Sequence, residues 1–179
     1  MNALGIGYTH VGRYAEAEAL FQQALAAKPL WGDSHFNHAL LLQKTGKMAE
    51  ALQEFKAGVT LSPLNGAAHR WYGEALLESG QLDEAVVQLQ RAVELEGTLE
   101  SMHDLVNVYL RQGNSTEAEP VLRRIIAKFP IDSSAHLALA KILEDAGKPE
   151  EALHQYQQVL ATDSGNQEAK VGAERIKKQ

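Results

Sequence analysis

Seven histidines are the residues of this chain best suited to metal binding or acid–base chemistry. His35, His69 and His136 recur at intervals of 34 and 67 residues, which would place them on separate packed helices. Axes of packed helices lie 8–10 Å apart, whereas a Zn–N bond is about 2 Å long, so these three side chains cannot share one ion. His35 and His38 lie three residues apart on one helix face, but no Asp, Glu or His completes a clear site. We interpret the histidines as packing residues and expect no metal and no cofactor.

Catalytic signatures are missing from the sequence. It contains no H-E-x-x-H, no G-x-S-x-G and no phosphate-binding P-loop. Cysteine is absent, which excludes a thiolate nucleophile and a disulfide framework. Gly5-Ile-Gly7 is half of a dinucleotide fingerprint, but no strand precedes it. Acidic pairs such as Glu150 and Glu151 stand where helices begin and complement the helix dipole. We therefore predict that the chain is not an enzyme.

Composition limits the class of partner. The 179 residues include 23 Asp and Glu against 17 Lys and Arg, a net charge of −6. The pI of about 5.6 argues against a nucleic-acid partner, since basic domains usually serve that role. No apolar run approaches the roughly 18 residues of a membrane span, and the N-terminus has no signal-peptide pattern. These features predict no membrane span and a cytoplasmic location.

A repeat of about 34 residues organises the chain. Small residues recur in register at Ala17, Ala51, Ala85, Ala118 and Ala152. Glycines recur at the same intervals, at Gly12, Gly46, Gly80, Gly113 and Gly147. The single shorter interval places a one-residue deletion near 96–99, where the turn has lost its proline. We expect units at 1–31, 32–65, 66–98, 99–132 and 133–166, the first of them truncated at its start, and a capping helix at 167–179.

Each unit has the pattern of two helices. The glycine ends the first helix with a left-handed cap, and a proline such as Pro63 ends the second. In the fourth unit, Thr116 and Glu119 fit a capping box at the start of the second helix. Pro120 lies just beyond, and we expect it to delay the start of that helix or bend it slightly.

This pattern resembles the tetratricopeptide repeat family over nearly the whole chain. The first unit matches the family motif at Leu4, Gly5, Tyr8, Ala17, Phe21, Ala24 and Pro29. The resemblance implies an all-α fold, a right-handed α-solenoid of antiparallel helix pairs. It also implies a noncatalytic scaffold that binds a peptide or helix of another protein in a groove lined by the first helices.

The family register assigns the groove positions. Those that we predict to bind a partner are Phe36, Leu40, Gln43, Arg70, Glu74, Leu77, His103, Asn107, Leu110 and Lys141. Asn2, Ile6, Leu137 and Glu144 fall at further lining positions, and Phe36 is the best candidate for an anchor. No window of three units matches the carboxylate clamp of the chaperone-binding members, so that function is not expected.

Two alternatives remain open. The chain could be a docking or regulatory arm of a larger enzyme, because family members precede glycosyl- and sulfotransferase domains. It could instead be a self-assembling scaffold that stacks through an uncapped N-terminal end.

Overall fold

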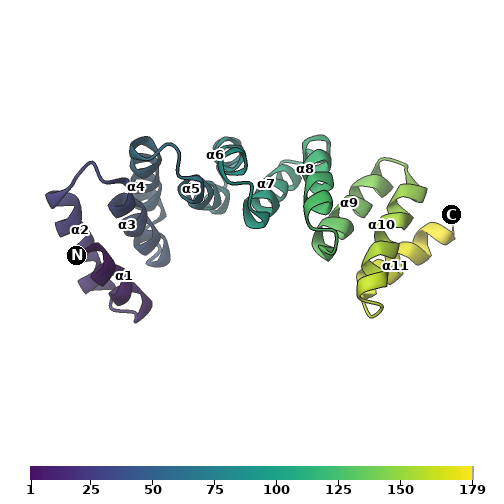
Figure 1. Ribbon diagram of the computed structural model, residues 1–179, viewed down its shortest axis with the longest axis horizontal. Coiled ribbons are helices and arrows are strands. Elements are labelled where there is room, and N and C mark those ends of the chain that lie inside the picture. The colour runs from purple at the N-terminus through teal and green to yellow at the C-terminus, as the bar shows by residue number, and fades with distance from the viewer. Residues whose placement is uncertain (179) are drawn as a thin grey trace. The chain divides into compact units, whose positions relative to one another are not determined.

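The computed structural model describes residues 1–178, and these form eleven α-helices (Figure 1). None of these helices combines the length and the hydropathy that crossing a membrane requires. Their bounds are α1 Asn2–His10, α2 Tyr14–Ala27, α3 Gly32–Lys44, α4 Met48–Leu61, α5 Gly66–Glu78, α6 Leu82–Leu95, α7 Leu99–Arg111, α8 Ser115–Lys128, α9 Ser133–Asp145, α10 Pro149–Thr162 and α11 Gln167–Lys177.

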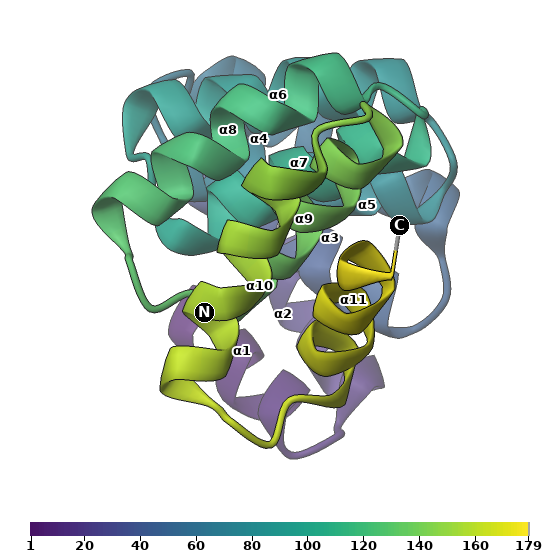
Figure 2. The same cartoon turned by 90° about the vertical axis from the view of Figure 1, so that its right-hand side faces the viewer.

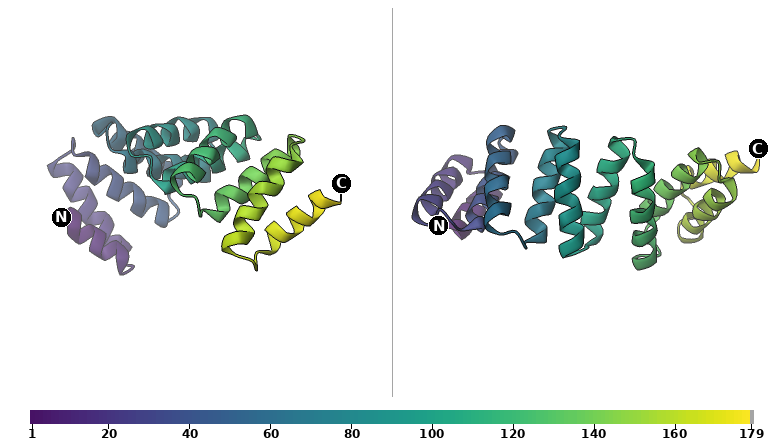
Figure 3. Two further views of the ribbon diagram at one scale, coloured as in Figure 1. Left: turned by 45° about the vertical axis from the view of Figure 1, so that its right-hand side comes forward. Right: turned by 90° about the horizontal axis from the view of Figure 1, so that it is seen from above.

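The five recurrent glycines close the turns between paired helices. Each lies in the middle of a three-residue turn with φ between 69° and 80°, a conformation that glycine adopts at no steric cost. The residue after each glycine donates its N–H to the carbonyl five residues earlier, as Lys47 does to Leu42 at 2.8 Å. Such a short turn reverses the chain, so the two helices of a pair run antiparallel (Figure 3).

The turns that join one pair to the next are four residues long, except between α6 and α7, where only 96–98 intervene. The predicted one-residue deletion is therefore confirmed at this turn. In four of these five turns the last residue caps the next helix with its side chain: Asn65, Thr98, Asp132 and Asn166. Trp31 stands at the corresponding position before α3 and makes no side-chain cap.

The chain divides into two compact units, and unit 1 is Met1–Asp104. Its core follows the repeat, because the small residues Ala17, Ala51 and Ala85 are fully buried where paired helices approach. Large side chains four positions later, Phe21, Phe55 and Leu89, are also at most 1% exposed. Gly5 lies directly against Phe21, where an added Cβ would stand 2.7 Å from the ring.

Unit 2 is Leu105–Gln179 and continues the same rules. Ala118 and Ala152 are fully buried, and α10 lies beside both α9 and α11 (Figure 2). Helix α11 lies within the range predicted for a capping helix, and it buries Ala169 and Ala173 against a cluster that includes Tyr156, with Ile176 packed alongside. Gln179, which we included in that prediction, lies outside the described residues.

The predicted start of α8 was wrong in detail. Its N-cap is Asn114, whose side chain accepts the Glu117 N–H at 3.3 Å, so Thr116 and Glu119 do not form a capping box there. Pro120 does not delay the helix, which begins at Ser115, three residues before Ala118 as in the other repeats. The cap and the glycine turn before it fix the helix start, and the proline ring falls inside the helix.

Candidate functional site

Three of the predicted groove residues in unit 1 are apolar, and two of them are buried. Phe36 is 2% exposed, and its ring lies where a Cβ on Gly58 would come within 2.4 Å of it. Leu77 is buried as well, and Leu40 is half-buried. The ring of Phe36 therefore belongs mainly to the packing of α3 against α4, and it offers a ligand little surface.

Arg70 and Glu74 form a charged cluster with Asp104. The Arg70 guanidinium lies 2.7 Å from the Glu74 carboxylate and 3.1 Å from that of Asp104. One cation therefore serves two carboxylates. Burial and then the neighbouring Asp104 raise the pKa of Glu74 to about 7, and Arg70 only partly opposes this. The cluster thus has one carboxylate more than it can neutralise.

Gln43 also has a partner within unit 1. Its amide donates to the Glu78 carboxylate at 2.7 Å, which links α3 to α5. His103 lies half-buried on α7.

The remaining predicted positions lie in unit 2. Asn107 and Leu110 are exposed on α7, whereas Lys141 on α9 forms an ion pair with Glu168 of α11. The neighbouring Glu144 is held by Arg175 of α11 at 2.7 Å and accepts a hydrogen bond from Tyr156 at 2.6 Å. On α9, therefore, the two charged residues at predicted groove positions form ion pairs with residues of α11.

A pocket of about 410 Å³ in unit 1 brings together both tryptophans of the chain. We call it the tryptophan pocket. Trp31 is 45% exposed at the start of α3, and Trp71 is half-buried on α5. The lining comprises Asn2, Ala3, Ile6, Trp31, Asp33, Phe36, Asn37, Asn65, Ala67 and Trp71.

A second pocket of about 260 Å³ adjoins the first, and we call it the aliphatic pocket. The two share Ile6 and Asn37, so they follow one another along α1 and α3. The lining of the aliphatic pocket comprises Ile6, Thr9, His10, Phe21, Asn37, Leu40 and Lys44. Together, these pockets make a hollow lined by apolar side chains and amide groups, with Asp33 in the tryptophan pocket and Lys44 in the aliphatic pocket as charged residues.

The chain matches the family model described as tetratricopeptide repeat over residues 3–63, 36–96 and 103–169. It belongs to the tetratricopeptide repeat family. The expected fold class, an α-solenoid of antiparallel helix pairs, is confirmed by this match and by solved structures of similar fold.

Relatives of this tetratricopeptide repeat chain include the type IV pilus assembly protein PilF of Pseudomonas aeruginosa. It is 36% identical over 58 residues, which are 32% of this chain and 23% of PilF. The matched segment therefore spans less than a quarter of that relative.

Two solved structures show the same fold. The structure of MamA has a TM-score of 0.79 at 20% identity, covering 98% of this chain and 97% of its own. YrrB, described as a tetratricopeptide repeat protein with an unusual peptide-binding site, has a TM-score of 0.75 at 21% identity, covering 87% of this chain and 81% of its own. At identities of 20% and 21%, these likenesses show the fold.

The recurrent histidines join the two helices of a repeat, which our interpretation as packing residues did not foresee. The His136 ring, 5% exposed, lies 2.7 Å from the Gln155 amide through Nδ1 and 3.0 Å from the Pro130 carbonyl through Nε2. His69 repeats this arrangement with Gln88 at 2.8 Å. A signal for this contact was available, because Glu or Gln follows each of these histidines after 19 residues.

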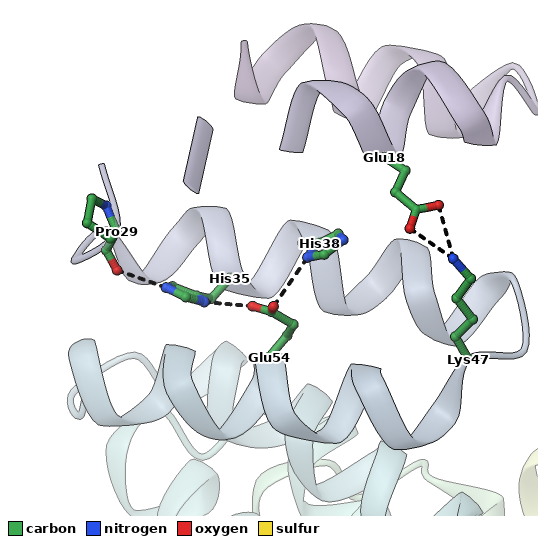
Figure 4. A network of polar contacts seen from close by, with 6 residues as sticks. All are labelled: Glu18, Pro29, His35, His38, Lys47 and Glu54. Carbon is green, nitrogen blue, oxygen red and sulfur yellow. Dashed lines mark hydrogen bonds and ion pairs between the residues drawn. The ribbon is translucent and has the colours of Figure 1, made fainter. Parts of the chain in front are cut away.

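In the second repeat the partner is a carboxylate (Figure 4). His35 Nδ1 lies 2.7 Å from Glu54 and its Nε2 lies 3.0 Å from the Pro29 carbonyl. Both partners of the ring are oxygen atoms that accept hydrogen bonds. His38 approaches the other Glu54 oxygen at 3.4 Å, and His38 and then His35 hold the pKa of the Glu54 carboxyl below its usual value. Across residues 1–178, no group of three or more His, Cys, Asp and Glu side chains is arranged to hold a metal ion.

Proposed function

We propose that this chain is a noncatalytic scaffold that binds a linear segment of a partner protein across α1, α3 and α5 of unit 1. The observation that carries the proposal is the pair of adjoining pockets with the shared residues Ile6 and Asn37. A bound segment would place one side chain in each pocket. The Asn37 amide between them can both donate to and accept from the peptide backbone.

The position of Trp31 supports this site. The equivalent residue in the other turns caps the next helix, and a side-chain cap typically contributes about 1 kcal/mol. At Trp31 the cap is replaced by a large aromatic side chain that remains 45% exposed in a pocket. Local rules of helix formation are most often broken where a residue serves function. Exposed tryptophans are also frequent anchors of protein interfaces.

A random library of displayed dodecapeptides, selected on the full chain, tests this function. The selected peptides should bind in the pockets, so the substitution Ile6→Glu should weaken them at least tenfold. Ile6 is 37% exposed and lines both pockets. Val87→Glu is the matched control, because Val87 is 59% exposed on α6 and lines neither pocket.

Circular dichroism would show that both variants keep their helices. The proposal fails if no peptide is enriched, or if the enriched peptides bind the Ile6→Glu variant as tightly as the unsubstituted chain.

A further inference from the structure

The net negative charge of the chain lies entirely in unit 1. Residues 1–104 contain 13 Asp and Glu against 7 Lys and Arg, a net charge of −6, whereas residues 105–179 contain ten of each. The unit that carries both pockets therefore attracts positively charged segments, and unit 2 is neutral by the same count. The electrostatic field of this net negative charge favours association with basic partners and disfavours acidic ones.

The tryptophan pocket can receive a cation. Among its lining residues within the described part of the chain, Asp33 is the one with a formal charge. Tryptophan faces attract ammonium and guanidinium groups more strongly than other aromatic rings. The Lys28 ammonium already lies 5.3 Å from the centroid of the Trp31 ring. Two indoles beside a carboxylate form the combination that holds a lysine or arginine side chain.

Further carboxylates continue from this pocket along α5. Glu74 and Glu78 follow Trp71 by three and seven residues, and this spacing places them on the same helix face. Arg70 is shared between Glu74 and Asp104, so this stretch has more negative than positive charge. A basic residue of a bound segment would supply the missing cation.

We propose that the segment bound by unit 1 is basic, with an arginine or lysine in the tryptophan pocket and an aliphatic residue in the aliphatic pocket. This inference rests on the proposed function and specifies the chemistry of its partner. The two residues should be about three positions apart. Asp33 and Leu40 are seven residues apart on α3, a rise of about 10 Å, and an extended chain advances about 3.3–3.6 Å per residue.

The enriched dodecapeptides described above provide the probe. The most enriched one is synthesised, together with versions in which each Arg or Lys is replaced by Gln. Binding to the full chain is measured by tryptophan emission, which reports on this site because both tryptophans of the chain line the pocket. Replacement of the basic residue should weaken binding at least tenfold, and added salt should weaken the parent peptide.

Charge reversal at Asp33 tests whether the basic residue of the peptide binds in the tryptophan pocket. In an Asp33→Lys variant the parent peptide should lose at least tenfold in affinity, and replacement of its basic residue by Gln should no longer matter. Asp83→Lys is the matched control, because both aspartates are exposed second residues of their helices and Asp83 lines neither pocket. This control should bind the peptide as the unsubstituted chain does.

The outcomes separate the two proposals. Enriched peptides that lack basic residues, or that tolerate the Gln replacement, overturn the inference even if Ile6→Glu still weakens them. Equal losses in the Asp33→Lys and Asp83→Lys variants also overturn it, because the effect would then come from overall charge. Peptides that ignore Ile6→Glu overturn the proposed function itself.

Discussion

The contact between His136 and Gln155 allows a quantitative test of how the two helices of a repeat are joined. The corresponding positions of the fourth repeat are Met102 and Val121, so the sequence there carries two apolar residues together. We predict that His136→Met and Gln155→Val are each destabilising, and that the double substitution costs much less than the two single losses combined.

The magnitude follows from the geometry. His136→Met removes hydrogen bonds of 2.7 and 3.0 Å and leaves the half-buried Gln155 amide without its partner. Gln155→Val leaves Nδ1 of a ring that is only 5% exposed without its partner. Leaving a buried polar group unpaired costs about 1–3 kcal/mol, whereas replacing both partners by apolar groups can be nearly neutral. The coupling should therefore be at least about 1 kcal/mol.

Urea unfolding of the four chains, followed by circular dichroism, measures the free energies of unfolding. The same cycle with His69→Met and Gln88→Val is an independent copy, because its ring nitrogens lie 2.8 and 3.2 Å from Gln88 and Pro63. The reasoning is refuted if the losses in the free energy of unfolding of the single variants add up to that of the double variant in both cycles. These histidines would then contribute by packing alone.

Other substitutions test packing and charge. Gly5→Ala should destabilise by about 1–3 kcal/mol because its Cβ would meet Phe21, whereas Gly7→Ala meets nothing and should stabilise by about 0.5–1 kcal/mol in thermal unfolding. The pKa of Glu74 is about 7 in the fold and 4.5 in the unfolded chain, so protonation of Glu74 favours the folded state. This contribution to stability is complete at a pH below 4.5 and is lost as the pH rises through about 7. Solvent screening limits it to less than about 1 kcal/mol, and Glu74→Gln should remove this part of the pH dependence of stability. Pro120→Ala should stabilise α8 by up to about 3 kcal/mol in urea unfolding, since it restores a helical N–H.

Much of the fold could be predicted because small residues and glycines recur at the same position of each repeat. Ala85 is fully buried and Gly80 has a φ of 80°, as their recurrence in register indicated. Even the deletion between α6 and α7 could be located from one shortened interval. The start of α8 could not be located from the sequence, because Asn114 and Thr116 are both good capping residues. Only the turn geometry decides between them.

The candidate site was less predictable, because helix register gives the face of a residue but not the surface left after packing. Phe36 and Leu40 share the predicted groove side of α3, yet neighbouring Gly58 leaves a space that the Phe36 ring fills. The binding residues that we predicted from the register therefore stay a prediction. The loop position of Trp31 lay outside that register, so the helix pattern could not indicate it.

The distribution of charge changes which partner is favoured. Taken over the whole sequence, a net charge of −6 argued only against nucleic acid. Once the fold separates unit 1 from unit 2, all of this net charge belongs to the unit that holds both tryptophans. An exposed indole alone would accept apolar or cationic side chains. In a unit with this charge, and beside Asp33, the balance favours a cation, because an aliphatic side chain gains nothing from the field.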